Sequence, residues 1–416
     1  MTTTEVVSMN TILKVLIPVL VLAAILCSGC TQQAAVPQAG TSAPILNITV
    51  PVAPIPVPSR NGINLAYELE LVPAAGQVPV VDNVEVLDPA TGNVLYTADG
   101  TVLATLYHPA SVPPPTPAEL QNGTAKLALP RISLWFVVSP DAVPDRLTHR
   151  LTLNRTASGL LPVIITGGEV TVRKDLAPVV IGPPMHGAGW MAMETTSPFT
   201  HHFSAQITLN SVTRVPQRYA QDWVFLDPVT GQAASGNATL ARNYYGFGKE
   251  IYAVANGTVV AASDGLPDIA TIYSAGGATI ATAAGNYVII DIGNRKYACY
   301  AHMENGSVRV KAGDTVQEGQ VIGLMGNSGN SDIPHLHFQV VTDIPSFLGA
   351  EGYPHVYRSF DVIGAVNATL GQECMAVPGY STSRLWTEFS DLVTFFPQPV
   401  HQENRLPENN AIVQFP

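Results

Sequence analysis

Hydrophobic and polar positions alternate in short runs over most of the chain. Between residues 60 and 175, runs such as INLAYELELV, VDNVEVLD, GTVLATLY, ISLWFVVS and HRLTLNRT are separated by Gly, Pro, Asn and Asp, at a spacing of about ten residues. Alternation places successive side chains on opposite faces of a strand, so each run predicts a half-buried strand. Many short strands between turn residues are typical of an antiparallel, immunoglobulin-like β-sandwich, which we expect at 60–175.

A second strand-rich region follows at 201–365, with glycine at most of its turns. Its runs are GTVVAA, NYVIIDIG, KYACYAHM, GSVRVKAGD, QVIGLMG and HLHFQVV. Residues 176–200 lack periodicity and predict a packed connector, and residues 366–416 are set apart as a C-terminal tail. The pattern therefore predicts an all-β protein with two β domains.

The N-terminus carries an apolar run, Val15 to Leu26, which follows Lys14 and ends in Cys27-Ser28-Gly29-Cys30. The run is shorter than the roughly 20 residues that span a bilayer as a helix and fits a signal-peptide core. Residues 1–30 thus predict a signal peptide with a lipoprotein anchor at Cys30. Ser28, Gly29 and Cys30 resemble a lipobox, the motif that precedes a lipidated cysteine, but Cys27 stands where that motif usually has an aliphatic residue. An uncleaved N-terminal anchor is therefore the alternative. Either places the chain at the cell surface, anchored to a membrane, with the Pro-rich residues 31–59 as a linker.

Composition and charge limit the classes of partner and of covalent modification that the chain can have. The chain is 46% hydrophobic and 12% charged, and its net charge is −11 without a Lys/Arg cluster, which excludes a nucleic-acid partner. Cys299 and Cys374 are too few for a disulfide scaffold, and either a pair or two free thiols fits. Asn-x-Ser/Thr sites compatible with a surface glycoprotein occur at Asn47, Asn122, Asn154, Asn237, Asn256, Asn305 and Asn367.

The strongest chemical signal is the segment Pro334-His335-Leu336-His337-Phe338. In a strand, His335 and His337 project from the same side, so they can serve one metal site as ligand and acid/base partner. A surface His pair is the alternative. A further histidine, His302, ends the run YACYAH, and a series of glycine turns leads from it to the His pair.

With these motifs in place, the chain from Gly285 to Val340 resembles the lysostaphin/LytM-type endopeptidases, peptidase family M23. The shared core reads tyrosine-alanine-histidine, a valine-glycine turn, "GQ-IG", "G-SG" and "PHLHF". The resemblance implies an antiparallel, duplicated-hybrid-motif-like β domain, a catalytic Zn²⁺, and a peptidoglycan-like cell-envelope peptide as substrate. There is no HExxH helix, which excludes the helical zincin arrangement.

The same resemblance implies a ligand set. Asp222 stands in QRYAQDWVFLD, but the position four residues earlier, usually a histidine ligand, is Arg218, which cannot bind zinc. A subset of the family with a β-sandwich before the peptidase domain has an upstream histidine, which His202 matches best in spacing, with His201 as the second choice. The implied zinc ligands are His202, Asp222 and His337, and the implied catalytic residues beside the water are His302 and His335.

Three functions fit these observations. The first is an exported zinc metalloendopeptidase that hydrolyses peptide cross-links of the cell envelope with a zinc-activated water. The second is a catalytically degenerate module that binds wall polymer or activates another hydrolase, which Arg218 favours. The third is a structural surface glycoprotein. Retention of His302, Asp222, His335 and His337 together favours the first.

Overall fold

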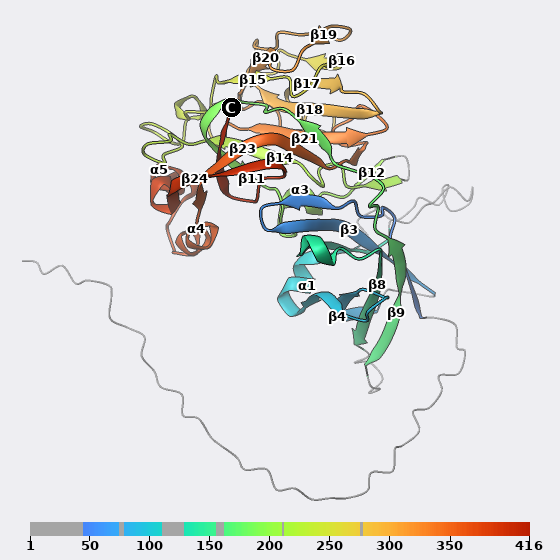
Figure 1. Ribbon diagram of the computed structural model, residues 1–416. Helices are drawn as coiled ribbons and strands as arrows, with labels where there is room; N and C mark the ends of the chain where they lie inside the picture. Colours follow the sequence, from blue (N-terminus) through green and yellow to red (C-terminus); the bar gives the residue numbers. More distant parts are fainter. Residues whose placement is uncertain (1–44, 75–78, 110–128, 155–161, 210–211, 275–277) are drawn as a thin grey trace, which may run out of the picture. The chain divides into compact units, whose positions relative to one another are not determined.

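The computed structural model describes residues 45–74, 79–109, 129–154, 162–209, 212–274 and 278–416. The predicted signal peptide, Cys30 and the first part of the predicted linker lie outside the described residues. Strands dominate both halves of the described chain, and helices are few and short (Figure 1). The predicted all-β class is confirmed.

The N-terminal β domain, defined here as strands β1 to β9, has two sheets. The first has the order β1-β3-β7-β6 with β2 paired to β3, and the second has the order β5-β4-β8-β9. Its elements are β1 (Leu46–Thr49), β2 (Val57–Ser59), β3 (Gly62–Pro73), β4 (Val80–Leu87), β5 (Val94–Asp99), α1 (Gly100–Leu106), β6 (Tyr107–His108), β7 (Arg131–Val138), η1 (Pro140–Ala142), β8 (Arg146–Asn154) and β9 (Val163–Thr171).

The two sheets share one hydrophobic core. Alternate residues of β3, such as Leu65, Tyr67 and Leu69, are fully buried against residues of the other sheet, such as Val84 and Leu151. This is the inward-facing set expected of strands with period 2. The strand order confirms two packed sheets, and the immunoglobulin-like assignment stays a prediction.

Two segments of this domain differ from the sequence interpretation. Part of the predicted linker forms β1 and β2, because Leu46 and Val57 find buried positions in hydrophobic clusters. The run GTVLATLY, predicted as a strand, is helix α1 and the short strand β6. Leu103 and Leu106 are both buried, and their spacing of three places them on one face of a helix.

The second half is built on one large sheet, whose main path is β10-β23-β25-β11-β14-β21-β18-β17-β16-β19. Its elements are β10 (Val179–Ile181), β11 (Gly187–Met193), α3 (His201–Ser204), β12 (Ile207–Leu209), β13 (Val212–Arg214), β14 (Gln221–Phe225), η2 (Ala241–Asn243), β15 (Glu250–Tyr252), β16 (Gly257–Ser263), β17 (Asn286–Asp291), β18 (Lys296–Met303), β19 (Thr315–Val316), β20 (Val321–Leu324), β21 (Leu336–Thr342), β22 (Glu351–Gly352), β23 (His355–Val366), α4 (Ala368–Met375), α5 (Thr382–Thr387), η3 (Phe389–Leu392), β24 (Val393–Arg405) and β25 (Ala411–Phe415).

The sheet includes segments that the sequence pattern does not predict as strands. The predicted connector contributes β10 and β11, and the predicted tail contributes β24 and β25, beside helices α4 and α5. β25 lies between β23 and β11, where Ile412 and Val413 are fully buried. Long-range pairing and burial therefore draw both segments into the sheet. The other predicted domain limits stay predictions.

One predicted strand is absent from its place. The run GSVRVKAGD, at 306–314, forms no strand, and the residues that follow it, Thr315–Val316, pair with β16. The backbone turns here instead, with Asp314 accepting a hydrogen bond from the Lys311 amide at 2.9 Å. A carboxylate that bonds a nearby backbone N–H stabilises such a turn.

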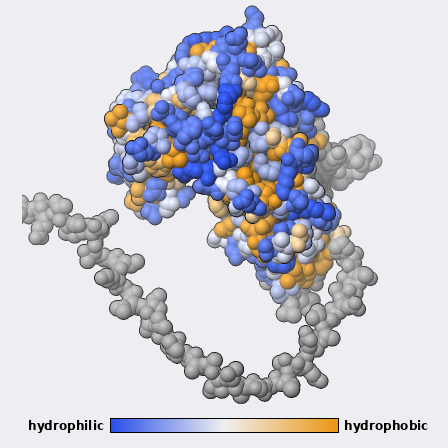
Figure 2. Space-filling model, viewed as in Figure 1, coloured by the Kyte–Doolittle hydropathy of each residue, from blue (hydrophilic) through white to orange (hydrophobic). Residues whose placement is uncertain are grey.

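The surface, the helices and the cysteines add three observations. Figure 2 shows hydrophilic and hydrophobic residues interspersed on the face drawn. No helix within the described ranges has the length and apolar character needed to cross a membrane. Cys299 is buried and Cys374 partly buried, and both are free, so of the two alternatives the structure has free thiols.

Candidate metal centre

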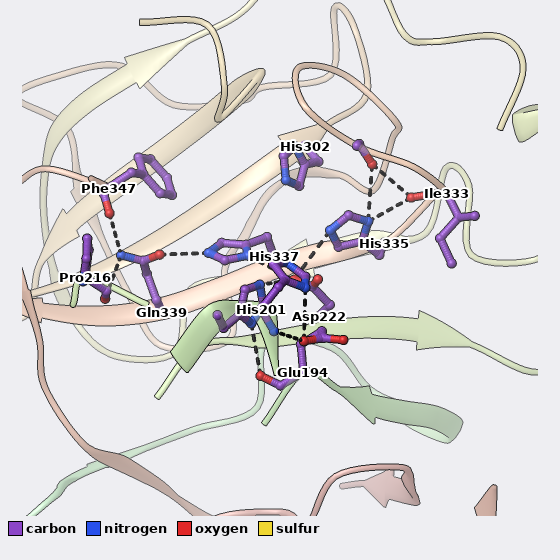
Figure 3. Close-up of polar contacts among 12 residues, drawn as sticks. Glu194, His201, Pro216, Asp222, His302, Ile333, His335, His337, Gln339 and Phe347 are labelled. Atoms are coloured by element: carbon purple, nitrogen blue, oxygen red, sulfur yellow. Dashed lines mark hydrogen bonds and ion pairs between the residues drawn. The ribbon is translucent and has the colours of Figure 1, made fainter. Parts of the chain in front are cut away.

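Asp222 and His337 come from the neighbouring strands β14 and β21 and stand directly opposite each other in the sheet register. Directly opposed residues of antiparallel strands project from the same face at short distance. Asp222 Oδ1 lies 2.9 Å from His337 Nδ1, and both side chains are nearly buried. The pairing of two adjacent strands thus fixes the centre of the site (Figure 3).

His302 reaches the same face through an irregularity near the end of β18. Asn286 pairs with Met303 and Val288 with Tyr300, so β18 carries one extra residue at this point. His302 has a positive φ of 62°, which a non-glycine residue rarely adopts. Bulges re-aim a side chain out of strict alternation, and here the His302 ring comes within 4.7 Å of the His335 ring, between centroids.

His202 comes from the one-turn helix α3, which follows β11. Thr200 caps this helix, because its side chain accepts a hydrogen bond from the Phe203 amide at 3.3 Å. His202 Nδ1 donates to the carbonyl oxygen of Glu194 at 3.0 Å. Its other nitrogen, Nε2, lies 3.4 Å from Asp222 Oδ1.

His335 lies immediately before β21, in a turn that fixes its ring. Its Nδ1 donates to the carbonyl oxygen of Ile333 at 2.7 Å and lies 3.2 Å from Ser331 Oγ. Its Nε2 lies 3.4 Å from Asp222 Oδ1. His335 therefore faces the same carboxylate oxygen as His202.

Gln339 fixes the orientation of the His337 ring. The Gln339 amide nitrogen donates to the carbonyl oxygens of Phe347, at 3.0 Å, and Pro216, at 3.3 Å. Its Oε1 must then be the acceptor that faces His337 Nε2 at 2.7 Å. His337 Nε2 consequently carries a proton, and Nδ1 is the nitrogen turned towards Asp222.

These hydrogen bonds assign the protons of the imidazole rings, because a carbonyl oxygen only accepts. His202 and His335 donate from Nδ1, and His337 donates from Nε2, so the remaining nitrogen of each ring faces Asp222 Oδ1 and carries a lone pair in the neutral imidazole. Lone pairs that converge on a carboxylate oxygen need a cation or a proton between them. Imidazole nitrogens and a carboxylate are the donor set that Zn²⁺ prefers, so the residues fit this ion.

The pKa shifts follow from burial and from Asp222. Burial works against the ionised carboxylate, but the His202 and His335 imidazoles hold the pKa of Asp222 well below its usual value. Burial, together with the His335 and His337 rings, lowers the pKa of His302 well below its usual value. Burial also lowers the pKa of His337. For His335, the proximity of Asp222 outweighs burial and raises the pKa.

His201, the second choice as ligand, lies at the edge of the centre. The nearest donor atoms of His201, His202 and Asp222 all lie within 4.8 Å of one another. However, His201 is exposed, and its Nδ1 lies 3.0 Å from the Glu194 carboxylate. Burial works against its charged form, but the hydrogen bond to Glu194 raises the pKa of His201. The geometry therefore favours His202 over His201 as the ligand.

Arg218, at the position of the usual family ligand, points away from the centre into two carboxylates. Its guanidinium is buried and bonds Glu68 of β3, with Nη2 to Oε2 at 2.8 Å, and Glu351 of β22, with Nη2 to Oε1 at 2.7 Å. A guanidinium only donates hydrogen bonds, so it pairs with carboxylates and not with a metal ion.

A cavity of about 350 Å³ opens beside the centre, a size in the range of ligand pockets. His302, His337 and His201 form part of its wall. The rest is mostly small or apolar, including Ala281, Ala283, Ala284, Ile280, Leu209, Phe347 and Leu348. A short uncharged chain segment could therefore lie against the histidines.

The structure brings together all five side chains that the sequence predicted for the site, and their roles stay predictions. Sequence reasoning missed Gln339 and Glu194. Gln339 follows His337 by two residues in a strand, so period-2 alternation could have placed it beside His337. Nothing in the sequence pattern marks Glu194, because its contribution to His202 is a backbone carbonyl.

Residues 243–346 match the model of peptidase family M23. The match contains His302, His335 and His337 and begins after Asp222. A peptidoglycan DD-endopeptidase, ShyA, of Vibrio cholerae serotype O1 is 40% identical over 91 residues, which are 21% of this chain and 20% of that protein. Endolysin 2638A of Staphylococcus phage 2638A is 36% identical over 94 residues, 22% of this chain and 16% of the endolysin.

Among solved structures, the catalytic domain of lysostaphin from Staphylococcus simulans is 29% identical, with 26% of this chain and 68% of that chain covered and a TM-score of 0.19. The aligned region spans about a fifth or less of the length of the curated relatives.

Proposed function

Since residues 243–346 form a domain of peptidase family M23, we propose that this protein is a zinc metalloendopeptidase that hydrolyses peptide cross-links of the cell envelope. The observation that carries the proposal is the convergence of His202 Nε2, His335 Nε2 and His337 Nδ1 on Asp222 Oδ1, at 2.9–3.4 Å. Imidazole nitrogens and a carboxylate oxygen gathered at one point are the donor set of zinc sites, which supports the proposal.

His202, Asp222 and His337 would hold the zinc ion. Three protein ligands leave one coordination position open, as in catalytic zinc sites. A bound Zn²⁺ would supply Lewis acidity at that point, making a water molecule more acidic and polarising a substrate carbonyl. Gln339 and the Glu194 carbonyl keep His337 and His202 turned towards this point, which is the usual task of partners behind the ligands.

His302 and His335 are placed to handle protons and charge. Each donates from Nδ1 to a carbonyl oxygen, of Ser328 at 2.8 Å and of Ile333 at 2.7 Å, so Nε2 is the reactive nitrogen of both rings. His302, whose low pKa keeps it neutral, can accept the proton of an attacking water at Nε2. His335, in its protonated form, can donate at Nε2 to the developing oxyanion.

The substrate class rests on the relatives and on the cavity. The names of ShyA and of the phage endolysin concern peptidoglycan or cell lysis, and peptide cross-links of such a polymer are the substrate proposed here. The small and apolar lining of the cavity supports an uncharged peptide segment at the site. We also propose that the chain is exported and anchored to a membrane, either through a lipid on Cys30 or through an uncleaved N-terminal apolar run.

A degenerate module that binds wall polymer or activates a separate hydrolase is the second candidate. Arg218 favours it, since the usual ligand position is committed to an ion pair with Glu68 and Glu351. The two candidates differ in whether α3 supplies a working third ligand.

The test measures zinc content and hydrolysis together. We expect the purified protein to hold about one zinc per chain by mass spectrometry of the elements. We also expect it to release peptide fragments from purified peptidoglycan. Treatment with a chelator should stop the release, and added Zn²⁺ should restore it. Protein that binds polymer but holds no zinc and releases no fragments would establish the degenerate module instead.

A further inference from the structure

The helix that carries His202 cannot hold its place by itself. α3 is a single turn of four residues, and isolated helices shorter than about 12 residues are marginal in water. Its Phe203 side chain is fully buried and His202 is 1% exposed. The position of His202 Nε2 beside Asp222 therefore depends on what Phe203 packs against.

Phe203 packs against Trp135 of β7, in the N-terminal β domain. The two rings meet edge to face, with centroids 5.1 Å apart and planes at 83°. Trp135 is itself fixed, because its indole nitrogen donates to Asn64 Oδ1 of β3 at 2.9 Å. It also packs against Tyr219, with centroids 5.7 Å apart. The support under α3 is thus a rigid part of the N-terminal sheet, whereas the ligands Asp222 and His337 belong to the large sheet.

A buried ion pair makes a second connection at the same place. Arg218 precedes Asp222 by four residues, and its guanidinium joins Glu68 of β3 to Glu351 of β22. The same guanidinium lies 6.0 Å from the centroid of the Phe203 ring. Glu68 is 1% exposed, so solvent screens the attraction between Glu68 and Arg218 only weakly.

We propose that the N-terminal β domain positions the zinc ligand His202, with Trp135 and the Glu68–Arg218 pair as positioning residues. The proposal rests on the zinc site proposed above and adds a dependence to it. Arg218 occupies the position at which a histidine ligand is usual, and here it binds Glu68 of the N-terminal sheet. The proposed ligand comes instead from α3, which that sheet supports. The metal site is therefore complete only while the N-terminal β domain is docked.

The test compares Zn²⁺ affinities of the full chain, measured by competition with a chromophoric chelator. Trp135→Ala removes the surface under Phe203, and we expect Zn²⁺ affinity to fall about 10–100-fold, the range found when partners behind metal ligands are removed. Trp135→Phe keeps an aromatic ring there and should restore most of the affinity. Tyr96→Ala is the matched control, because Tyr96 stacks on Phe136 in the same domain without touching α3.

The absorption spectrum of bound Co²⁺ separates positioning from general destabilisation. Loss of the His202 ligand should change the visible bands of the Co²⁺ form in Trp135→Ala and leave them unchanged in Tyr96→Ala. Equal Zn²⁺ affinity and the same Co²⁺ spectrum in wild type and Trp135→Ala would overturn the proposal while leaving the zinc site intact. A wild type that binds no Zn²⁺ would instead remove the proposed function itself.

A second pair of variants keeps the test decisive where Trp135→Ala does not fold. Phe203→Leu weakens the same contact from the side of α3, and Glu68→Gln removes the charge that holds Arg218. Both should weaken Zn²⁺ binding several-fold, with circular dichroism unchanged. Folded variants that bind Zn²⁺ as tightly as the wild type would overturn the proposal.

Discussion

Asp222 and His337 are directly opposed residues on neighbouring strands, with Oδ1 and Nδ1 2.9 Å apart. Because the pair is fixed by sheet register, moving either strand by one residue would turn one of the two side chains to the other face. The two proposed ligands are thus as rigid as the centre of the sheet, whereas His202 depends on a short helix beyond it.

Removal of His337 should abolish tight metal binding. His337→Ala leaves Asp222 and His202 as ligands, and a zinc site with two protein ligands binds weakly. We expect less than about a tenth of the wild-type zinc content after dialysis, since a structural zinc ligand contributes several kcal/mol of binding energy. The control is His401→Ala, which removes an exposed histidine of β24. A zinc content near that of the wild type in His337→Ala would show that this residue is not a ligand.

Removal of His302 should spare metal and reduce turnover. His302 contacts the His335 and His337 rings, but its Nδ1 is bonded to Ser328 and its proposed part is proton transfer. We expect His302→Ala to keep its zinc and to lose about 10²–10⁴-fold in kcat, the usual contribution of general acid–base catalysis. The rate of fragment release and the zinc content are measured on the same sample. Loss of zinc in step with activity would make His302 a ligand instead.

Gln339 should tune metal affinity without contacting the metal. Gln339→Met preserves the approximate size of the side chain and removes the acceptor for His337 Nε2, so the ring loses its fixed orientation. We expect Zn²⁺ affinity to fall about 10–100-fold. Gln320→Met, a change of the same kind at an exposed turn, is the matched control. An affinity equal to that of the control would mean that packing alone orients His337.

The sequence was sufficient for much of this site because its signals are local. The runs at β16, β17, β18, β20 and β21 are short, apolar and separated by glycine-containing turns, so their strands could be predicted. His335 and His337 are two residues apart, and a spacing of two places side chains on one face of an extended segment. The bulge that turns His302 to this face was not visible in the pattern, because a bulge changes the register without changing the run of hydrophobic residues.

What the sequence could not predict depends on long-range packing. Arg218 and Glu68 lie 150 residues apart, and no local pattern connects them. The strand Ala411–Phe415 of the predicted tail pairs with β11, more than 200 residues earlier. The sequence of a short apolar run does not show whether the run joins a distant sheet, because the tertiary structure decides which sheet edge it can pair with.

Acid should destabilise the N-terminal β domain through His149. This residue is fully buried, with Nε2 2.8 Å from the Tyr67 hydroxyl and Nδ1 3.0 Å from the carbonyl oxygen of Gly168. Burial lowers its pKa from 6.5 to about 4 in the folded protein. In the unfolded chain the imidazole titrates normally, so between these values the unfolded state binds more protons than the folded state.

The sign follows from this difference. The free energy of unfolding is unaffected by His149 above pH 6.5 and decreases as the pH falls towards 4, the value at which the folded state also begins to bind the proton. The decrease between about pH 7 and pH 4.5 should be roughly 2–3 kcal/mol.

Urea unfolding of the full chain, followed by tryptophan fluorescence, measures this free energy at each pH. A chelator is present throughout, so that release of a metal ion does not contribute to the pH dependence. His149→Gln should reduce this dependence by about that amount, although it lowers stability at neutral pH. His401→Gln, at an exposed site, should leave the dependence on acid in place. If His149→Gln and the wild type lose equal stability on acidification, other groups are responsible.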